Sequence, residues 1–100
     1  MNFTSKEKSA IISTLSAIMN ADGSVDAREQ HFLDEIFRKF AITVEEYQAS
    51  AHMSKAECKQ IYNEMTEDKK ERTQKCLLDM VGADDKVDLR ELSVVRSLFV

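Results

Sequence analysis

The 100-residue chain contains no proline, no tryptophan and only two glycines. A many-stranded sheet would need more turn-forming residues, and the alanine, leucine, glutamate and lysine content favours helices. No apolar run approaches the roughly 18 residues of a membrane-spanning helix. Serine and threonine interrupt the apolar stretch near the N-terminus, so it does not resemble the continuous core of a secretion signal. These absences predict an all-α fold and a cytoplasmic protein without direct membrane insertion.

Positive charge is also scarce, because 14 basic residues face 18 acidic ones and the formal net charge is −4. A protein that binds nucleic acid as its main partner needs an excess of positive charge to contact phosphates. We therefore expect no nucleic-acid partner. The length fits one domain, and we predict a single domain over residues 1–100.

Residues that commonly carry chemistry are few and widely separated. The spacing of Cys58 and Cys76 excludes a CxxC redox motif, and neither His31 nor His52 belongs to a zinc-binding pattern. We expect both cysteines to be buried apolar residues and both histidines to lie at the surface, while a disulfide stays open. No nucleophile elbow or glycine-rich phosphate loop is present. The chain is therefore predicted not to be an enzyme.

Helix starts are marked by a Thr, Ser or Asp followed three residues later by a Glu, the pattern of a capping box. Such pairs begin at Thr4, Asp26, Thr43 and Ser54. Apolar residues at helical spacing follow, including a stripe of phenylalanines in the second segment. The sequence predicts a compact bundle of about six helices. We expect the phenylalanines and methionines in the core, and only an exposed cluster of them would indicate a groove for a partner.

A charged segment precedes the last apolar stripes of the chain. Asp68 with Arg72 and Glu71 with Lys75 are acid-before-base pairs four residues apart, a spacing that favours ion pairs along a helix. We interpret this segment as a solvated helix face rather than a binding tail.

The chain contains an internal repeat. Residues 21–29, ADGSVDARE, match residues 83–91, ADDKVDLRE, at six of nine positions with an offset of 62. The same offset places apolar residues on apolar residues on both sides of the match. We predict two halves, each a helix, an acidic turn and a helix, at about 4–41 and 66–100, with short helices at 43–65 between them. Duplicated units of this kind tend to pack about a pseudo-twofold axis.

The acidic turns have a structural interpretation. The second Asp of each turn can cap the next helix, and the Glu three residues later can close the box, each box contributing about 1 kcal/mol. The first Asp is then a turn residue that satisfies local backbone donors. This explains the acidic residues without a ligand.

The alternative interpretation is a weak site for a divalent cation, because carboxylate oxygens are the donors that Ca²⁺ and Mg²⁺ prefer. The pattern is not an EF-hand, since Ala27 and Leu33 stand where its glycine and bidentate glutamate belong. No other cofactor is indicated. The candidate metal ligands are Asp22, Asp26, Glu29, Asp84, Asp88 and Glu91.

The doubled Ala-Asp-Gly-x-Val-x-x-x-Glu pattern at 21–29, with its degenerate copy at 83–91, resembles the TerB-like family. The family is named for tellurite-resistance proteins, and similar domains occur in a membrane-anchored DnaJ-type co-chaperone. The resemblance implies an all-helical bacterial domain, with paired acidic turns that bind divalent metal and a role in stress-response or membrane-associated complexes. Asp85 replaces the second glycine of the pattern, which favours the first turn over the second.

Two hypotheses follow. The first is a non-enzymatic TerB-like domain that binds a divalent cation weakly and acts through a protein partner. The second is a purely structural scaffold whose acidic residues only cap helices. The apolar end at Leu98, Phe99 and Val100 indicates either a docked terminus or a partner surface, including one for another copy of the chain.

Overall fold

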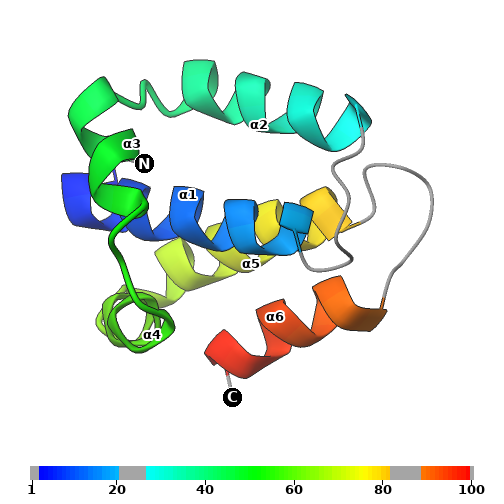
Figure 1. Cartoon of the computed structure of the whole chain (residues 1–100). Coiled ribbons are helices and arrows are strands. Elements are labelled where there is room, and N and C mark those ends of the chain that lie inside the picture. Colours follow the sequence, from blue (N-terminus) through cyan, green and yellow to red (C-terminus); the bar gives the residue numbers. More distant parts are fainter. Residues whose placement is uncertain (1–2, 21–26, 82–88, 100) are drawn as a thin grey trace.

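The computed structural model describes residues 3–20, 27–81 and 89–99 (Figure 1). These residues form six α-helices and no strand, so the predicted all-α bundle of about six helices is confirmed. The helices are α1 (Ser5–Asn20), α2 (Ala27–Lys39), α3 (Val44–Ser50), α4 (Lys55–Asn63), α5 (Glu67–Val81) and α6 (Leu89–Phe99).

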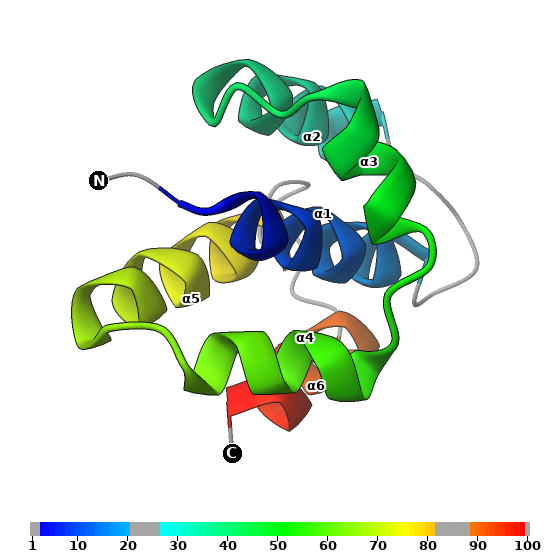
Figure 2. The same cartoon turned by 90° about the vertical axis from the view of Figure 1, so that its left-hand side faces the viewer.

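Helix α1 lies at the centre of the bundle and contacts all five other helices (Figure 2). A helix covered on several sides can be apolar over a wide arc. Accordingly, Ile11, Ile12, Leu15 and Ile18 have no exposed surface. This helix provides the largest share of the core, and the remaining helices pack around it.

The rest of the core consists of aliphatic and sulfur-containing side chains and one tyrosine. Tyr62 on α4 is fully buried, and its hydroxyl donates a 2.8 Å hydrogen bond to the backbone oxygen of Ala10. Thr14 Oγ1 lies 2.6 Å from the same hydroxyl and also bonds to the Ala10 oxygen. Burying a phenol requires such partners. Cys58 and Met65 are buried beside it, as predicted.

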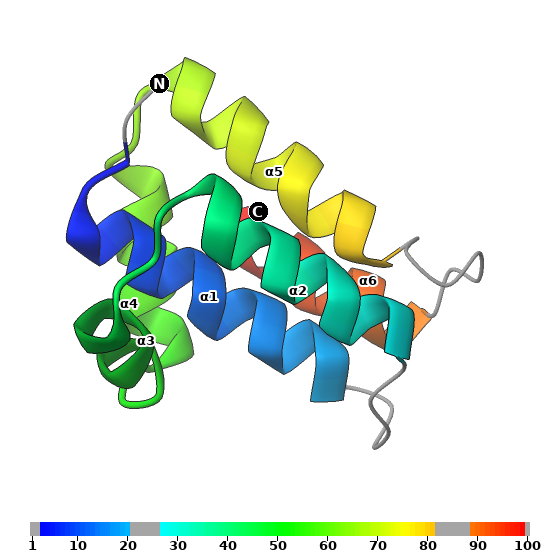
Figure 3. The ribbon, with the colours of Figure 1, turned by 90° about the horizontal axis from the view of Figure 1, so that it is seen from above.

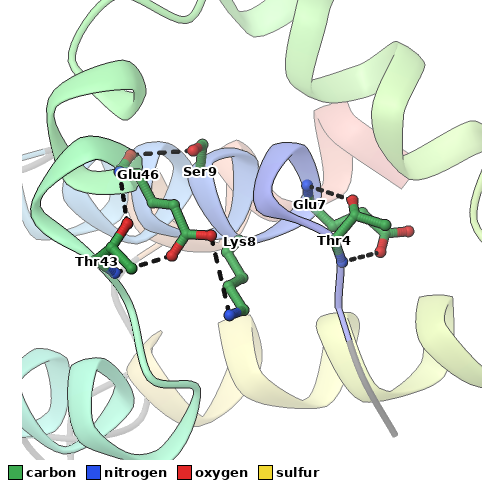
Figure 4. Close-up of polar contacts among 6 residues, drawn as sticks. All are labelled: Thr4, Glu7, Lys8, Ser9, Thr43 and Glu46. Atoms are coloured by element: carbon green, nitrogen blue, oxygen red, sulfur yellow. Dashed lines mark hydrogen bonds and ion pairs between the residues drawn. The ribbon is translucent and has the colours of Figure 1, made fainter.

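The predicted capping boxes at Thr4, Thr43 and Ser54 form, and Figure 4 shows the first two. The box predicted at Asp26 lies outside the described residues. Glu7 accepts a 2.8 Å bond from the Thr4 backbone N–H, and Thr4 Oγ1 accepts one from the Glu7 N–H. Thr43 and Glu46 make the same reciprocal pair at the start of α3. The box at Ser54 is also complete. These local signals were read correctly because they need no tertiary contact.

The end of α2 has an unusual backbone. Ala41 has φ of 51°, in the left-handed region that favours glycine. The Ile42 N–H bonds back to the Phe37 carbonyl at 3.0 Å, and the Ala41 N–H bonds to the Arg38 carbonyl. This is the Schellman pattern of helix termination. The turn directs the chain from α2 into α3.

The two halves of the repeat correspond helix by helix. An offset of 62 carries Ser5 and Ala27, which begin α1 and α2, onto Glu67 and Leu89, which begin α5 and α6. Burial is matched as well. Equivalent buried pairs are Leu15 with Leu77, Ile18 with Met80, Leu33 with Val95 and Ile36 with Leu98.

Two predictions about side chains were wrong. The expected ion pairs Asp68–Arg72 and Glu71–Lys75 do not form; the ion pairs made by α5 among described residues are Lys69–Glu7 and Lys70–Glu67. The described phenylalanines are also not fully buried. Phe3, Phe32, Phe37 and Phe40 are only partly buried and pack against the edge of the core.

Both cysteines are free and buried, as expected. Leu98 is 3% exposed, which supports a docked C-terminal end; Phe99 and Val100 lie outside the side chains that the structure describes. None of the helices within the described ranges is long and apolar enough to cross a membrane.

Candidate functional site

The acidic candidates fall mostly outside the described residues. Asp22, Asp26, Asp84 and Asp88 lie outside them, and Glu91 is in the first turn of α6 with a side chain that the structure does not describe. Within the described part of the chain, no group of three His, Cys, Asp or Glu side chains could hold a metal. The structure therefore leaves the proposed metal site as a prediction.

The helix ends next to the two acidic segments lie together. Figures 1 and 3 show the end of α1, the start of α2, the end of α5 and the start of α6 at the same end of the bundle. This arrangement follows from the repeat, because equivalent helices of the two halves run toward the same end.

Glu29 is the one candidate whose side chain is described. It lies in the first turn of α2 and is 2% exposed. Two other glutamates at the third helical position are similarly buried, Glu7 at 8% and Glu46 at 6%. Each of those two closes a capping box without a ligand. Burial of Glu29 therefore matches that of Glu7 and Glu46, whereas Glu57, which closes the box of α4, is exposed.

Glu7 has a second role that the sequence did not predict. Lys69 Nζ on α5 lies 2.8 Å from Glu7 Oε1, and both side chains are largely shielded from solvent. Burial by itself raises the pKa of Glu7, but the hydrogen bonds from Lys69 and Thr4 outweigh it and lower the pKa below its usual value. The sequence repeat could have indicated this contact, because Glu7 and Lys69 are equivalent positions separated by the offset of 62. Thr66 is the equivalent of Thr4 in the second half, and its hydroxyl accepts a hydrogen bond from the Lys69 N–H at the start of α5.

Glu46 connects α3 to α1 (Figure 4). Its backbone oxygen accepts a 3.0 Å bond from the Ser9 hydroxyl, and its carboxylate lies 3.9 Å from Lys8 Nζ. The Thr43 N–H holds the pKa of Glu46 below its usual value, with smaller contributions from Ser5 and Lys8. This carboxylate is occupied by structural contacts.

The histidines are at the surface, as predicted. His31 is highly exposed, and its Nε2 lies 3.1 Å from Glu35 Oε1 one helical turn away. His52 is exposed just after α3.

The largest aromatic cluster lines a cleft between α2 and α5. The cleft has a volume of about 510 Å³, and Phe3, Phe32, Ile36, Phe40 and Cys76 form its apolar surface. Phe3 stacks against Phe40 at 5.3 Å between ring centroids. Burial raises the pKa of Cys76 to about 11, so the thiol is protonated at neutral pH. Sequence analysis placed these aromatic residues in the core and so missed the cleft.

Five charged residues complete the cleft. Three are basic and two are acidic, and none of the basic ones forms an ion pair with a residue that the structure describes. These residues are Lys39, Arg72, Lys75, Glu35 and Asp79.

The fold and the repeated acidic segments define an all-helical domain of two related halves, each with an acidic segment between two helices. The chain belongs to the TerB family, because the family model described as tellurite resistance protein TerB matches residues 8–99. The resemblance in the sequence is thereby confirmed. Comparisons with curated proteins and with solved structures give no match.

Proposed function

We propose that this TerB domain is a non-enzymatic interaction module that binds a divalent cation, Ca²⁺ or Mg²⁺, weakly at its acidic segments and acts through a protein partner in a stress response. The observation that carries the proposal is the position of the four helix ends that flank the segments (Figure 3). The six and seven residues between these ends can span at most about 25 Å when fully extended. The described helix ends on both sides of each acidic segment are at one end of the bundle, which supports a shared site.

The donor chemistry fits a hard cation. Carboxylates bind Ca²⁺ and Mg²⁺ through oxygen, and a bound cation would offset the repulsion among neighbouring negative charges. Binding is expected to be weak, because a carboxylate that accepts backbone N–H bonds has fewer lone pairs to offer. The proposed ligands are Asp22, Asp26 and Glu29 in the first half and Asp84, Asp88 and Glu91 in the second.

A purely structural role is the second candidate, and a specific observation favours it. Glu7 and Glu46 close capping boxes and are buried without any ligand. Glu29 has the same position in its helix and similar burial. On this alternative the acidic segments stabilise helix starts and bind nothing.

A metal titration separates the two candidates. Amide chemical shifts of the ¹⁵N-labelled protein would be followed while CaCl₂ or MgCl₂ is added to millimolar concentration. Saturable shifts at residues 22–29 and 84–91 support the metal site, and their absence at millimolar metal supports caps alone. The Asp22→Asn/Asp84→Asn variant should lose the shifts, whereas Asp34→Asn on the exposed face of α2 should keep them.

Asp26→Ser provides a complementary test. Serine caps a helix nearly as well as aspartate, so the free energy of unfolding without metal should change by less than about 0.5 kcal/mol. A working metal site should nevertheless lose affinity. Equal metal response in this variant and the parent protein would remove Asp26 from the ligand set.

Two further properties belong to the proposal. The net charge of −4 supports the absence of a nucleic-acid partner. We also propose that the domain is non-enzymatic and cytoplasmic. Association of two copies at the C-terminal end would be tested by sedimentation.

A further inference from the structure

The cleft between α2 and α5 contains an aromatic surface at the edge of the core that is only partly buried. Phe3, Phe32 and Phe40 are partly buried there, although phenylalanine usually contributes to the interior. Aromatic residues and arginine are enriched at the centres of protein interfaces. A partly exposed cluster of this kind is suited to receiving apolar side chains from a partner.

The charges along the cleft are arranged in order. Figures 1 and 3 show α2 and α5 side by side and running in opposite directions. The contact of Phe3 with Phe40, and the position of Lys69 at 5.9 Å from the Phe3 ring centre, place the end of α2 beside the start of α5. Lys39 and Arg72 therefore lie toward this end and Asp79 lies toward the other, while Glu35 on α2 is one helical turn from Lys39.

The basic residues are available for a partner. Lys39, Arg72 and Lys75 are exposed, and no ion pair joins them to another residue in the described ranges. Glu35, one helical turn from Lys39, is shared with His31, and Asp79 lies toward the opposite end. An occupant with acidic groups at the first end and basic groups at the second would be complementary in charge.

We propose that this cleft binds an amphipathic helix of a partner protein, with its apolar stripe on Phe32, Ile36 and Phe40 and its acidic end beside Lys39 and Arg72. The lining positions on α2 extend over about 12 Å, which corresponds to roughly two turns of a bound helix. Insertion of an amphipathic helix into a groove is a common form of peptide recognition. The inference rests on the proposed partner role and is independent of the metal site.

A synthetic peptide tests the proposal. The probe is an amphipathic peptide of about 15 residues, the length at which an isolated helix begins to be stable. It has leucines at helical spacing, glutamates in its first half and lysines in its second. A scrambled peptide of identical composition is the control. Binding would be measured by fluorescence anisotropy and by amide chemical shifts of the protein.

The expected result is saturable binding of the amphipathic peptide, with shifts confined to the cleft helices, and weaker or no binding of the scrambled peptide. Arg72→Glu should weaken binding about tenfold. Arg38→Glu, the same charge reversal on α2 outside the cleft, should leave it unchanged. A spin label on the acidic end of the peptide should broaden the amides near Lys39 and Arg72 and spare those near Asp79.

Several outcomes would overturn the proposal: no binding, equal binding of both peptides, shifts at another surface, or a label effect at Asp79. Concentration-dependent dimerisation with shifts in the cleft would also overturn it and assign the cleft to a second copy. The titration is run with EDTA and again with Ca²⁺. A lost peptide response with an intact metal response rejects only this inference, and the reverse result rejects only the metal site.

Discussion

Helices α2 and α6 occupy equivalent places in the two halves, yet they are packed differently. Helix α6 lies against α1, α4 and α5, whereas the main contacts of α2 are with α1 and α5 alone. Helix α2 has no comparable contact with α4, and it borders the cleft instead. The repeat thus determines which residues face inward, and the inserted short helices determine which half is covered.

The largest expected effect concerns the equivalent positions Leu98 and Ile36, which are 3% and 6% exposed. Leu98→Ala should lower the free energy of unfolding by about 3 kcal/mol and Ile36→Ala by about 2 kcal/mol, because Ile36 borders the open cleft. Urea unfolding of both variants measures the two losses in free energy of unfolding and shows which is larger. An equal or larger loss at Ile36 would mean that α2 is packed as firmly as α6.

The ion pair between the two halves should have the next largest effect. Glu7→Gln should destabilise the protein by about 1 to 2 kcal/mol at neutral pH, because it leaves Lys69 partly buried without its carboxylate. A double-mutant cycle with Lys69→Met isolates the coupling between the two residues.

The same pair predicts a dependence on pH. Folding lowers the pKa of Glu7 below 4.5, so its contribution is present above that pH and is lost as the pH falls through the folded-state pKa. The stabilities of the parent protein and Glu7→Gln should therefore converge in acid. A constant difference down to pH 2 would contradict this account.

Ala41 offers a smaller, stabilising change at the end of α2. Ala41→Gly should raise the free energy of unfolding by about 0.5 to 1 kcal/mol, because glycine adopts positive φ without a steric cost. Ala17→Gly on the exposed side of α1 is the matched control and should destabilise by about 1 kcal/mol. Thermal unfolding of the two variants measures the two effects. If Ala41→Gly also destabilised the protein, the left-handed backbone conformation of Ala41 would be refuted.

The smallest effect is a difference in thiol reactivity. Cys76 on α5 borders the cleft at 9% exposure, whereas Cys58 on α4 is 2% exposed. Cys76 should react several-fold faster with a disulfide reagent, at a rate that rises with pH because its pKa is about 11. Mass spectrometry after partial labelling identifies the modified residue. Equal rates would indicate that both cysteines react through global unfolding.

The sequence predicted features that depend on neighbouring residues. The boxes at Thr4, Thr43 and Ser54 and the buried face of α1 were recognisable because each signal lies within one or two helical turns. The repeat also predicted the correspondence of helices. The resemblance to the TerB family, which the family model confirms, came from the residues of the same repeat.

The features that sequence analysis missed depend on how distant helices meet. The stripe of α2 reads as a core face, but its phenylalanines reach only partial burial. Phe32 and Phe40 border the cleft, and Phe37 packs against Tyr47 of α3. Lys69 was read as part of a solvated face and instead crosses to Glu7. Of the six acidic candidates, Glu29 alone has a described side chain, so the metal site is still predicted from sequence.

The contact between Glu7 and Lys69 has a consequence for the origin of the fold. The two residues hold the same position in their respective halves, and they bond to each other across the two halves. Two identical halves would place like charges against each other there, and the pair would repel. The bond can exist only in a molecule whose halves have diverged in sequence. The Glu7–Lys69 ion pair therefore favours packing of the first half against the second half over packing of either half against an identical copy.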